Sequence, residues 1–237
     1  MSNLRRTNPY PLIISFLNLR RTVGVLSISM PAVLIIGAYF VGGCSSIQDS
    51  ISHYYYTIMR DLYVGTICAV SLFLISYRGY DKNDSIFTSL AGIFLLGVAF
   101  FPTTQNPDAS CTVLHLEPNK LRVYIHYASA VLFFGTLAYI SVFLFTKGTQ
   151  QKGTRKRLRN KIYRGCGVTL ILVIIIIVMV RTVPFLENNL GHLKPVFWAE
   201  WIGLFAFGMA WLIKGELFFN DVVEKYANTA EGDSNVQ

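Results

Sequence analysis

The dominant pattern along the chain is a series of long apolar runs separated by short polar segments. A helix needs about 20 mostly apolar residues to cross a bilayer. Six stretches reach that length when the Tyr and Arg residues at their ends extend to the interface. The runs lack the alternation of apolar and polar residues that is typical of membrane β-barrels. The pattern therefore predicts an all-α integral membrane protein, a bundle of six transmembrane helices at residues 22–43, 57–77, 85–101, 121–145, 163–182 and 196–214.

Two segments bear on this interpretation. Val173–Val178 is rich in β-branched residues, which favour strands in water. In lipid the backbone must satisfy its own hydrogen bonds, so a helix is expected there. The apolar stretch 9–19 is too short to span, and we expect it to lie along the membrane interface. No loop is long enough to build a soluble core. We therefore expect one membrane domain at residues 1–219 and a polar tail at 220–237.

Composition supports the membrane class and excludes a soluble protein. Only 14% of the 237 residues are charged, whereas soluble domains carry about 25%. Hydrophobic residues make up 53% of the chain, and the mean hydropathy is +0.46. These values also exclude a disordered chain, a collagen-like repeat and a disulfide-dense secreted scaffold.

Basic residues indicate how the chain is oriented. They gather before the first span, between the second and third spans, and above all at residues 147–164, which carry eight Lys or Arg and no acidic residue. The positive-inside rule places these segments and both termini in the cytoplasm. The net charge of +8 reflects this bias. A basic cluster also occurs in nucleic-acid-binding proteins, but a membrane-flanking loop accounts for it better, so we expect membrane lipids and no nucleic acid as partners.

The four cysteines divide into two pairs. Cys68 and Cys166 fall in or beside spans and are expected to be packing residues. Cys44 and Cys111 fall in outer loops, where an oxidising compartment permits a disulfide between them. An alternative is that Val41–Cys44 is a lipoprotein cleavage box, but the apolar run before it is long for a signal peptide and five further spans follow.

Ionisable residues at the outer ends of spans two, four and six form the candidate site. Such residues are costly in a membrane and suggest function. We expect Arg60, Asp61, His126 and Glu200 to converge with Tyr56 in an outward-facing pocket. Because buried charges need partners, Arg60 should pair with Glu200 or Asp61. Taken singly, each residue also fits a structural role, as an interfacial anchor or as a bond between helices.

Binding and transport are two functions that such a pocket could perform. The leading hypothesis is that it binds a lipid headgroup or small solute, with Arg60 and Lys120 receiving a phosphate. Transport of a small solute, or proton coupling through Asp61, His126 and Glu200, is a further alternative. Against transport, the centres of the spans carry almost no charge, and neither an inverted repeat nor a pair of broken helices is visible in the sequence.

The other alternative is a zinc-dependent membrane hydrolase that acts on lipid. His53, His126 and Asp61 or Glu200 could hold the metal and leave one position open for water. The chain lacks the His-x-x-x-His pair that ceramidase-type membrane hydrolases carry on a late helix, and it has no H-E-x-x-H, G-x-S-x-G or C-x-x-C motif. Zinc is therefore the expected cofactor only under this alternative.

Several short segments resemble a known family. They are His53–Gly65, Ser76–Asp81, Phe101–Thr103, His126–Ala130 and Trp211–Glu216. Together they are similar to small bacterial polytopic membrane proteins that carry only a domain-of-unknown-function label. The resemblance implies a multi-pass protein of the bacterial inner membrane and implies no activity.

Ala206 and Ala210 form a small-xxx-small pair, which favours close helix packing within the chain or in a homo-oligomer.

Overall fold

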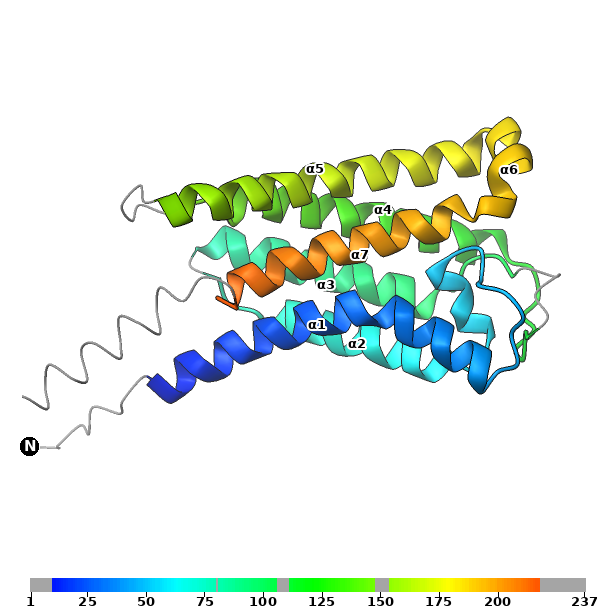
Figure 1. Cartoon of the computed structure of the whole chain (residues 1–237), viewed down its shortest axis with the longest axis horizontal. Coiled ribbons are helices and arrows are strands. Elements are labelled where there is room, and N and C mark those ends of the chain that lie inside the picture. The colour runs from blue at the N-terminus through cyan, green and yellow to red at the C-terminus, as the bar shows by residue number, and fades with distance from the viewer. Residues whose placement is uncertain (1–9, 80, 106–110, 148–153, 218–237) are drawn as a thin grey trace, which may run out of the picture.

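The structure is a computed structural model that describes residues 10–79, 81–105, 111–147 and 154–217 (Figure 1). Within these residues it is all-helical and contains no strand, which confirms the predicted all-α class. The connections hold the 3-10 helices η1 (Ile51–Tyr56) and η3 (Gly191–Leu193) and the short helix α6 (Pro184–Leu190). The long helices are α1 (Tyr10–Phe40), α2 (Arg60–Ser76), α3 (Lys82–Phe100), α4 (Lys120–Tyr139), which continues through the π-helical turn η2 (Ile140–Leu144), α5 (Thr154–Thr182) and α7 (Pro195–Lys214).

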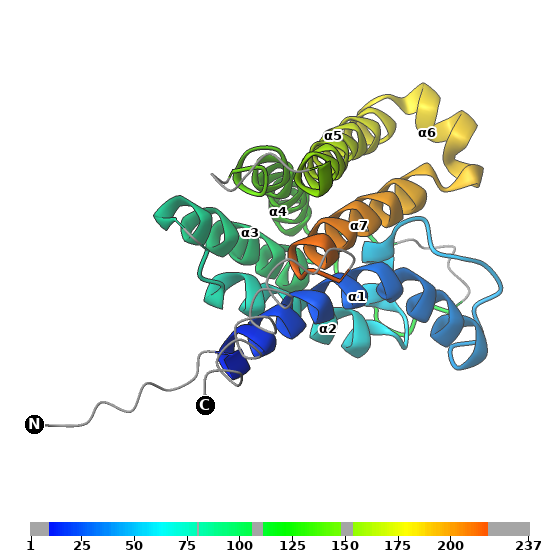
Figure 2. The ribbon, with the colours of Figure 1, turned by 60° about the vertical axis from the view of Figure 1, so that its left-hand side comes forward.

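The six long helices pack as a bundle that brings the first and last of them together. α1 lies against α7, α7 against α5, α5 against α4, α4 against α3, and α3 against α2, which in turn contacts α1 (Figures 1 and 2). α7 is the most buried of the apolar helices and α5 is the least buried. The bundle core is therefore organised around α7.

Within the described residues, five helices are long and apolar enough to cross a membrane, which fits a multi-pass membrane protein. They comprise Ser15–Phe40, Lys82–Phe100, Lys120–Leu144, Lys156–Thr182 and Pro195–Lys214. These helices correspond to five of the six predicted spans, and most of their first and last residues lie close to the predicted ones. α2 has 17 residues and is shorter than all of these helices. The second of the six spans therefore stays a prediction. The predicted tail at 220–237 lies outside the described residues.

The start of the chain corrects one prediction. Residues 10–19 do not form a separate interfacial segment but are the first turns of α1. The side chain of Leu17 is buried, and the neighbouring Arg20 and Arg21 bind backbone carbonyls at the end of α7. These contacts keep residues 10–19 continuous with the rest of α1. The short apolar length of this segment does not predict them.

We name the two ends of the bundle by the residues that distinguish them. At one end α1 and α5 begin and α7 ends, and at the other end α7 begins (Figure 1). The first, which we call the basic end, contains Arg20, Arg78, Lys147 and Arg157, and the second, which we call the disulfide end, contains the Cys44–Cys111 bond. The expected disulfide is present, with Cα atoms 5.0 Å apart. Cys68 and Cys166 are free thiols.

The basic end is closed by two arginines of α1 that bind the C-terminus of α7. Arg20 is only 5% exposed. It donates to the Tyr77 hydroxyl at 2.7 Å and to the Lys214 carbonyl at 3.1 Å. Its guanidinium lies 4.4 Å from the ring centroid of Phe16 and 5.3 Å from that of Tyr77. Arg21 donates to the next two carbonyls along the chain. The guanidinium groups thus satisfy the carbonyls that a helix end leaves without partners.

Small residues allow α1 and α7 to approach closely. A Cβ atom at Gly208 would lie 2.6 Å from the Gly24 carbonyl, and one at Gly24 would lie 2.8 Å from the Gly208 carbonyl. Glycine is therefore required at both positions. Ala206 and Ala210 are also buried within the bundle, so this small-xxx-small pair packs inside the chain.

Candidate functional site

The 3-10 helix η1 fills the centre of the disulfide end with polar and aromatic side chains. All six residues of η1, Ile51–Tyr56, are buried. Ser50 caps its start, since the Ser50 hydroxyl accepts a hydrogen bond from the His53 backbone N–H at 3.3 Å. On the other side, Lys194 binds the Ile47 carbonyl and forms an ion pair with Asp49 at 3.4 Å. These contacts hold the connection after α1 inside the bundle.

His53 is a buried imidazole held by two partners. The residue is only 4% exposed, and its Nδ1 lies 2.6 Å from the Ser50 hydroxyl. It also hydrogen-bonds the Thr104 backbone. The pKa of His53 is lowered to about 4, mainly by burial and then by the charge of Arg181, while Asp49 opposes the shift. The imidazole is therefore neutral at pH 7.

Glu200 anchors the start of η1. The carboxylate of Glu200, in the second turn of α7, accepts a hydrogen bond from the Ile51 backbone N–H at 2.5 Å, and it also bonds Ser52. The Tyr63 hydroxyl in turn donates to the Ser52 hydroxyl at 3.4 Å. A carboxylate at the N-terminal end of a helical turn is a favourable arrangement. Glu200 therefore has a structural role, since it holds the start of η1 against α7.

His126 and Tyr56 fix the segment that follows α3. His126 Nδ1 donates to the Phe101 carbonyl at 2.7 Å, because a carbonyl oxygen can only accept. The Tyr56 hydroxyl donates to the Thr103 carbonyl at 2.6 Å, and the Thr103 hydroxyl donates to the Tyr127 hydroxyl at 3.2 Å. Both side chains are thus committed to backbone acceptors on the same short segment.

We call His53, Tyr56, His126 and Glu200 the buried cluster. Arg60 and Asp61 lie apart from it. They form an ion pair at 3.9 Å at the start of α2, and the Asp61 side chain is 97% exposed. The Arg60 guanidinium lies 4.9 Å from the centroid of the Tyr55 ring and donates to its hydroxyl at 3.3 Å. One expected pairing, Arg60 with Asp61, is present. Glu200 is held instead by η1, so the structure does not bring Arg60 and Asp61 together with His126 and Glu200.

The proposed zinc ligands are likewise not assembled. Asp61 faces outward, whereas His53 and His126 are buried and bonded to neighbouring groups. Across the described residues, no group of three or more His, Cys, Asp or Glu side chains could hold a metal ion. A half-buried arginine that the sequence pattern did not single out also acts on His53. Arg181, in the last turn of α5, acts electrostatically on His53 and pairs with Glu187 at 3.3 Å.

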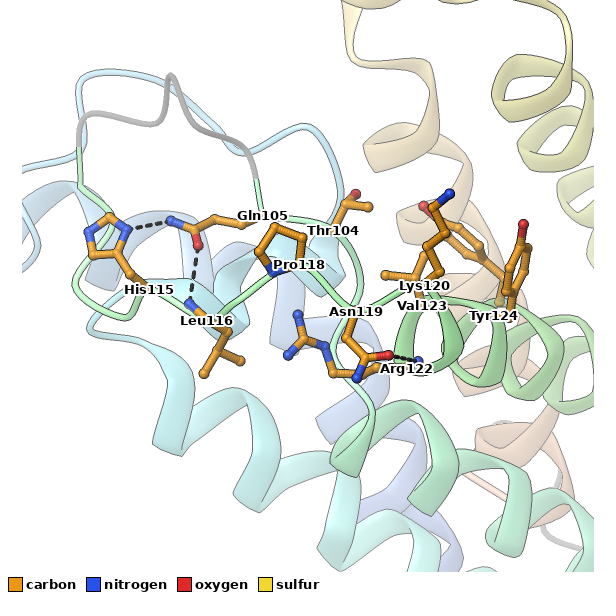
Figure 3. Close-up of a pocket in the computed structure, with 11 residues that line it drawn as sticks. Thr104, Gln105, His115, Leu116, Pro118, Asn119, Lys120, Arg122, Val123 and Tyr124 are labelled. Carbon is orange, nitrogen blue, oxygen red and sulfur yellow. Dashed lines mark hydrogen bonds between the residues drawn. The ribbon is translucent and has the colours of Figure 1, made fainter.

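A pocket of about 760 Å³ opens beside the buried cluster, between the segment before α4 and the first two turns of α4 (Figure 3). None of the five residues predicted to bind a ligand lines it. Lys120, which was expected to contact a phosphate, lines it together with a second cation, Arg122. The lining residues are Thr104, Gln105, His115, Leu116, Pro118, Asn119, Lys120, Arg122, Val123, Tyr124 and Tyr127.

Local hydrogen bonds give this pocket a fixed shape. The Asn119 side chain caps α4 by accepting from the Arg122 backbone N–H at 3.1 Å, and Arg122 donates to the Glu117 carbonyl at 3.1 Å. Gln105 lies 2.7 Å from His115 Nδ1 and accepts from the Leu116 N–H (Figure 3). Hydrogen bonds among the lining residues therefore fix the shape of the pocket. Thr104, which lines the pocket, also hydrogen-bonds His53 through its backbone.

The fold and this composition fit the class of multi-pass helical membrane proteins. Comparison with protein-family models, curated proteins and solved structures finds no match to the chain. The sequence resemblance to a bacterial membrane family therefore gains no support from these comparisons, and the geometry of the site is the basis for a function.

Proposed function

We propose that the protein is a six-span membrane protein with cytoplasmic termini, whose outward-facing pocket binds the phosphate of a lipid headgroup or a small anionic solute. The position of the pocket differs from the expected one between spans two, four and six. It lies at the start of α4, with Lys120 and Arg122 in its wall. The observation that carries the proposal is this pair of cations in a preformed pocket at the end of an apolar helix.

Size and lining chemistry both suit such a ligand. Ligand pockets have volumes of roughly 300–1,000 Å³ and are mainly apolar with a few placed polar groups. This pocket measures about 760 Å³ and combines two cations with Leu116, Val123 and Tyr124. Arginine binds phosphate through a fork of donors, and lysine binds it as a point charge. Apolar walls beside these cations fit the glycerol and upper acyl chains of a lipid.

The position of the pocket along α4 places it at headgroup depth. Lys120 is the first residue of a helix that is long and apolar enough to span. Leu121 and Tyr124 are exposed beside it, and aromatic residues of this kind are typical of the membrane–water interface. A lipid in the adjacent leaflet could therefore reach the cations without leaving the bilayer.

The orientation rests on the distribution of basic residues. The basic end gathers Arg20, Arg78, Lys147 and Arg157, whereas the disulfide end holds the bond that an oxidising compartment permits. A sixth span in α2 follows if its flanking Tyr and Arg side chains extend to the interfaces. With six spans both termini lie on the basic side, which we assign to the cytoplasm of a bacterial inner membrane.

Calorimetric titration of the purified protein in detergent tests the binding proposal. The ligands are short-chain phosphatidylglycerol, inorganic phosphate and short-chain phosphatidylcholine. The variant K120Q/R122Q removes both cations of the pocket. We expect it to weaken binding of the anionic ligand by at least about tenfold, because hydrogen bonds to charged groups contribute roughly 1.5–3 kcal/mol each. Phosphatidylglycerol binding without phosphate binding identifies a lipid, and binding of both identifies a phosphate site.

Arg60→Gln is the matched control, because Arg60 is another cation at the same end and does not line the pocket. The control should bind as the wild type does. Equal affinity of K120Q/R122Q and wild type, or an equal loss in the control, would overturn the proposal. The hydrolase alternative is not proposed, since within the described residues no group of three His, Cys, Asp or Glu side chains could hold a metal ion, with either Asp61 or Glu200 as the carboxylate. A proton relay through Asp61, His126 and Glu200 is not proposed either, since Asp61 is exposed to solvent and His126 bonds the Phe101 carbonyl.

A further inference from the structure

The basic end of α5 carries three cations on one helical face. Arg157, Lys161 and Arg164 are spaced by four and three residues and are all exposed. At 3.6 residues per turn they point within about 60° of one another. They form the first part of what we call the α5 outer face. The opposite side of the helix is buried in the bundle through Tyr163, Cys166 and Leu170.

The other described cations on this part of α5 behave differently. Lys156 and Arg159 are partly buried and have interaction partners. Asp81, an acidic residue near this end of the bundle, pairs with Lys147 at 3.8 Å. No ion pair with a carboxylate is formed by the three cations of the α5 outer face in the described part of the chain. Among the residues that the structure describes, no carboxylate neutralises their charge.

The same face continues directly into exposed aliphatic side chains. Val168, Ile171 and Ile175 follow at helical spacing and are exposed, and with the cations they occupy about 80° of the helix circumference. From Arg164 to Ile175 the face is about 17 Å long, roughly half of the ~30 Å bilayer core and so about the depth of one leaflet. A row of cations above a row of aliphatic side chains matches one molecule in particular: a lipid with an anionic headgroup and acyl chains.

We propose that the α5 outer face binds an anionic phospholipid from the leaflet at the basic end. The phosphate is held by Arg157, Lys161 and Arg164, and an acyl chain lies along Val168 and Ile171. Charge complementarity selects the headgroup, since each Lys or Arg near an anionic membrane surface contributes about 1 kcal/mol. A nucleic acid would use the cations alone and would leave the aliphatic part of the face without a role.

Reconstitution in phosphatidylcholine vesicles with spin-labelled lipids tests this proposal. The measured quantity is the motionally restricted fraction of labelled phosphatidylglycerol relative to labelled phosphatidylcholine. The wild type should prefer phosphatidylglycerol, and R157Q/K161Q/R164Q should lose that preference, by about fivefold in affinity for each cation removed. All three residues are exposed, so the variant should fold, and an unchanged melting temperature verifies this.

The matched control is R78Q/K82Q/K147Q, which removes the same charge from exposed positions elsewhere on the basic end. It should keep the preference for phosphatidylglycerol. An equal loss in both triple variants would mean that net charge alone attracts the lipid, and this would overturn the proposal. Retained preference in R157Q/K161Q/R164Q would overturn it too.

Two further arms distinguish the α5 outer face from the pocket beside α4 and from a nucleic-acid surface. The loss should persist in a K120Q/R122Q background, because that pocket lies at the other end of the bundle. An RNA oligonucleotide titrated onto the protein in detergent should not bind. RNA binding that disappears in R157Q/K161Q/R164Q, with lipid preference unchanged, would assign the face to nucleic acid and contradict the proposal.

Discussion

At each end of the bundle, charged side chains form hydrogen bonds with backbone groups at a helix terminus, and the charges at the two ends are opposite. At the disulfide end, the carboxylate of Glu200 accepts the hydrogen bond of the Ile51 N–H, at the start of a helical turn. At the basic end, the guanidinium groups of Arg20 and Arg21 donate to carbonyls at the end of α7. Each choice matches the partial charge of the helix terminus that it contacts.

The ends differ in how they hold their polar groups. The disulfide end holds the imidazole of His53, the Glu200 carboxylate and several hydroxyls at η1, and the Cys44–Cys111 bond ties this end covalently. The basic end buries a permanent charge, Arg20, between the rings of Phe16 and Tyr77. An imidazole can gain a proton as the pH changes, whereas a guanidinium cannot lose one. Stability should therefore depend on redox state and pH at one end and on shape and hydrogen bonding at the other.

The largest expected effect comes from breaking the covalent link. Cys44→Ser removes a disulfide that joins positions 67 residues apart. The chain-entropy relation gives a loss of about 4 kcal/mol in the free energy of unfolding for a loop of this size. Denaturant unfolding of the detergent-solubilised protein measures it. Cys68→Ser changes a free thiol and is the control, and equal stability of Cys44→Ser and wild type would contradict the prediction.

Acidification should destabilise the protein through His53. Its pKa is about 4 in the folded state against an ordinary value of 6.5, because burial disfavours the charged form. The unfolded chain therefore binds the proton first, and stability falls as the pH drops from about 6.5 towards 4. A shift of this size corresponds to about 3 kcal/mol. His53→Gln should reduce the fall in unfolding free energy between pH 7 and 4.5.

His115→Gln is the companion measurement for this pH series. His115 is exposed at the same end of the bundle, so its replacement should leave the pH dependence as it is in the wild type. If the wild type keeps the same unfolding free energy between pH 7 and 4.5, the difference drawn between the two ends fails.

The smallest of the three effects concerns the basic end. Arg20→Met keeps an unbranched side chain but removes the hydrogen bonds to Tyr77 and to the Lys214 carbonyl. We expect a loss of about 2 kcal/mol in unfolding free energy, with no dependence on reductant. Arg157→Met at an exposed position should change it by less than about 0.5 kcal/mol. A fully stable Arg20→Lys would show that charge matters there and the two-armed geometry does not.

Apolar length and cysteine placement predicted much of the fold. Backbone in lipid must form helices, so the runs predicted five of the long helices closely. Cys44 and Cys111 form the disulfide that was predicted from their positions between the apolar runs. The prediction for the first turns of α1 was wrong, because an apolar stretch of that length gives no sign that Arg20 and Arg21 bind α7.

The grouping of site residues could not be predicted in the same way. Hydropathy gives the depth of Arg60, Asp61 and Glu200 but not the direction in which each points. The fold of η1 into the bundle gave Glu200 a backbone partner, which no side-chain pattern could indicate. Arg181 did leave a signal, since it is the only charged residue between Arg164 and Glu187. An isolated charge of this kind is a functional or structural marker by default.

The contact between α1 and α7 has a consequence for how the protein is made. α1 leaves the ribosome well before α7, yet the two helices pack side by side and close the basic end through Arg20 and Arg21. These bonds cannot form until translation of α7 is complete. Until then, the face of α1 that packs on α7 in the finished bundle, which includes Gly24, must be covered by lipid or by the insertion machinery. A helix that is made early in synthesis therefore reaches one of its main neighbours only after α7 has been made.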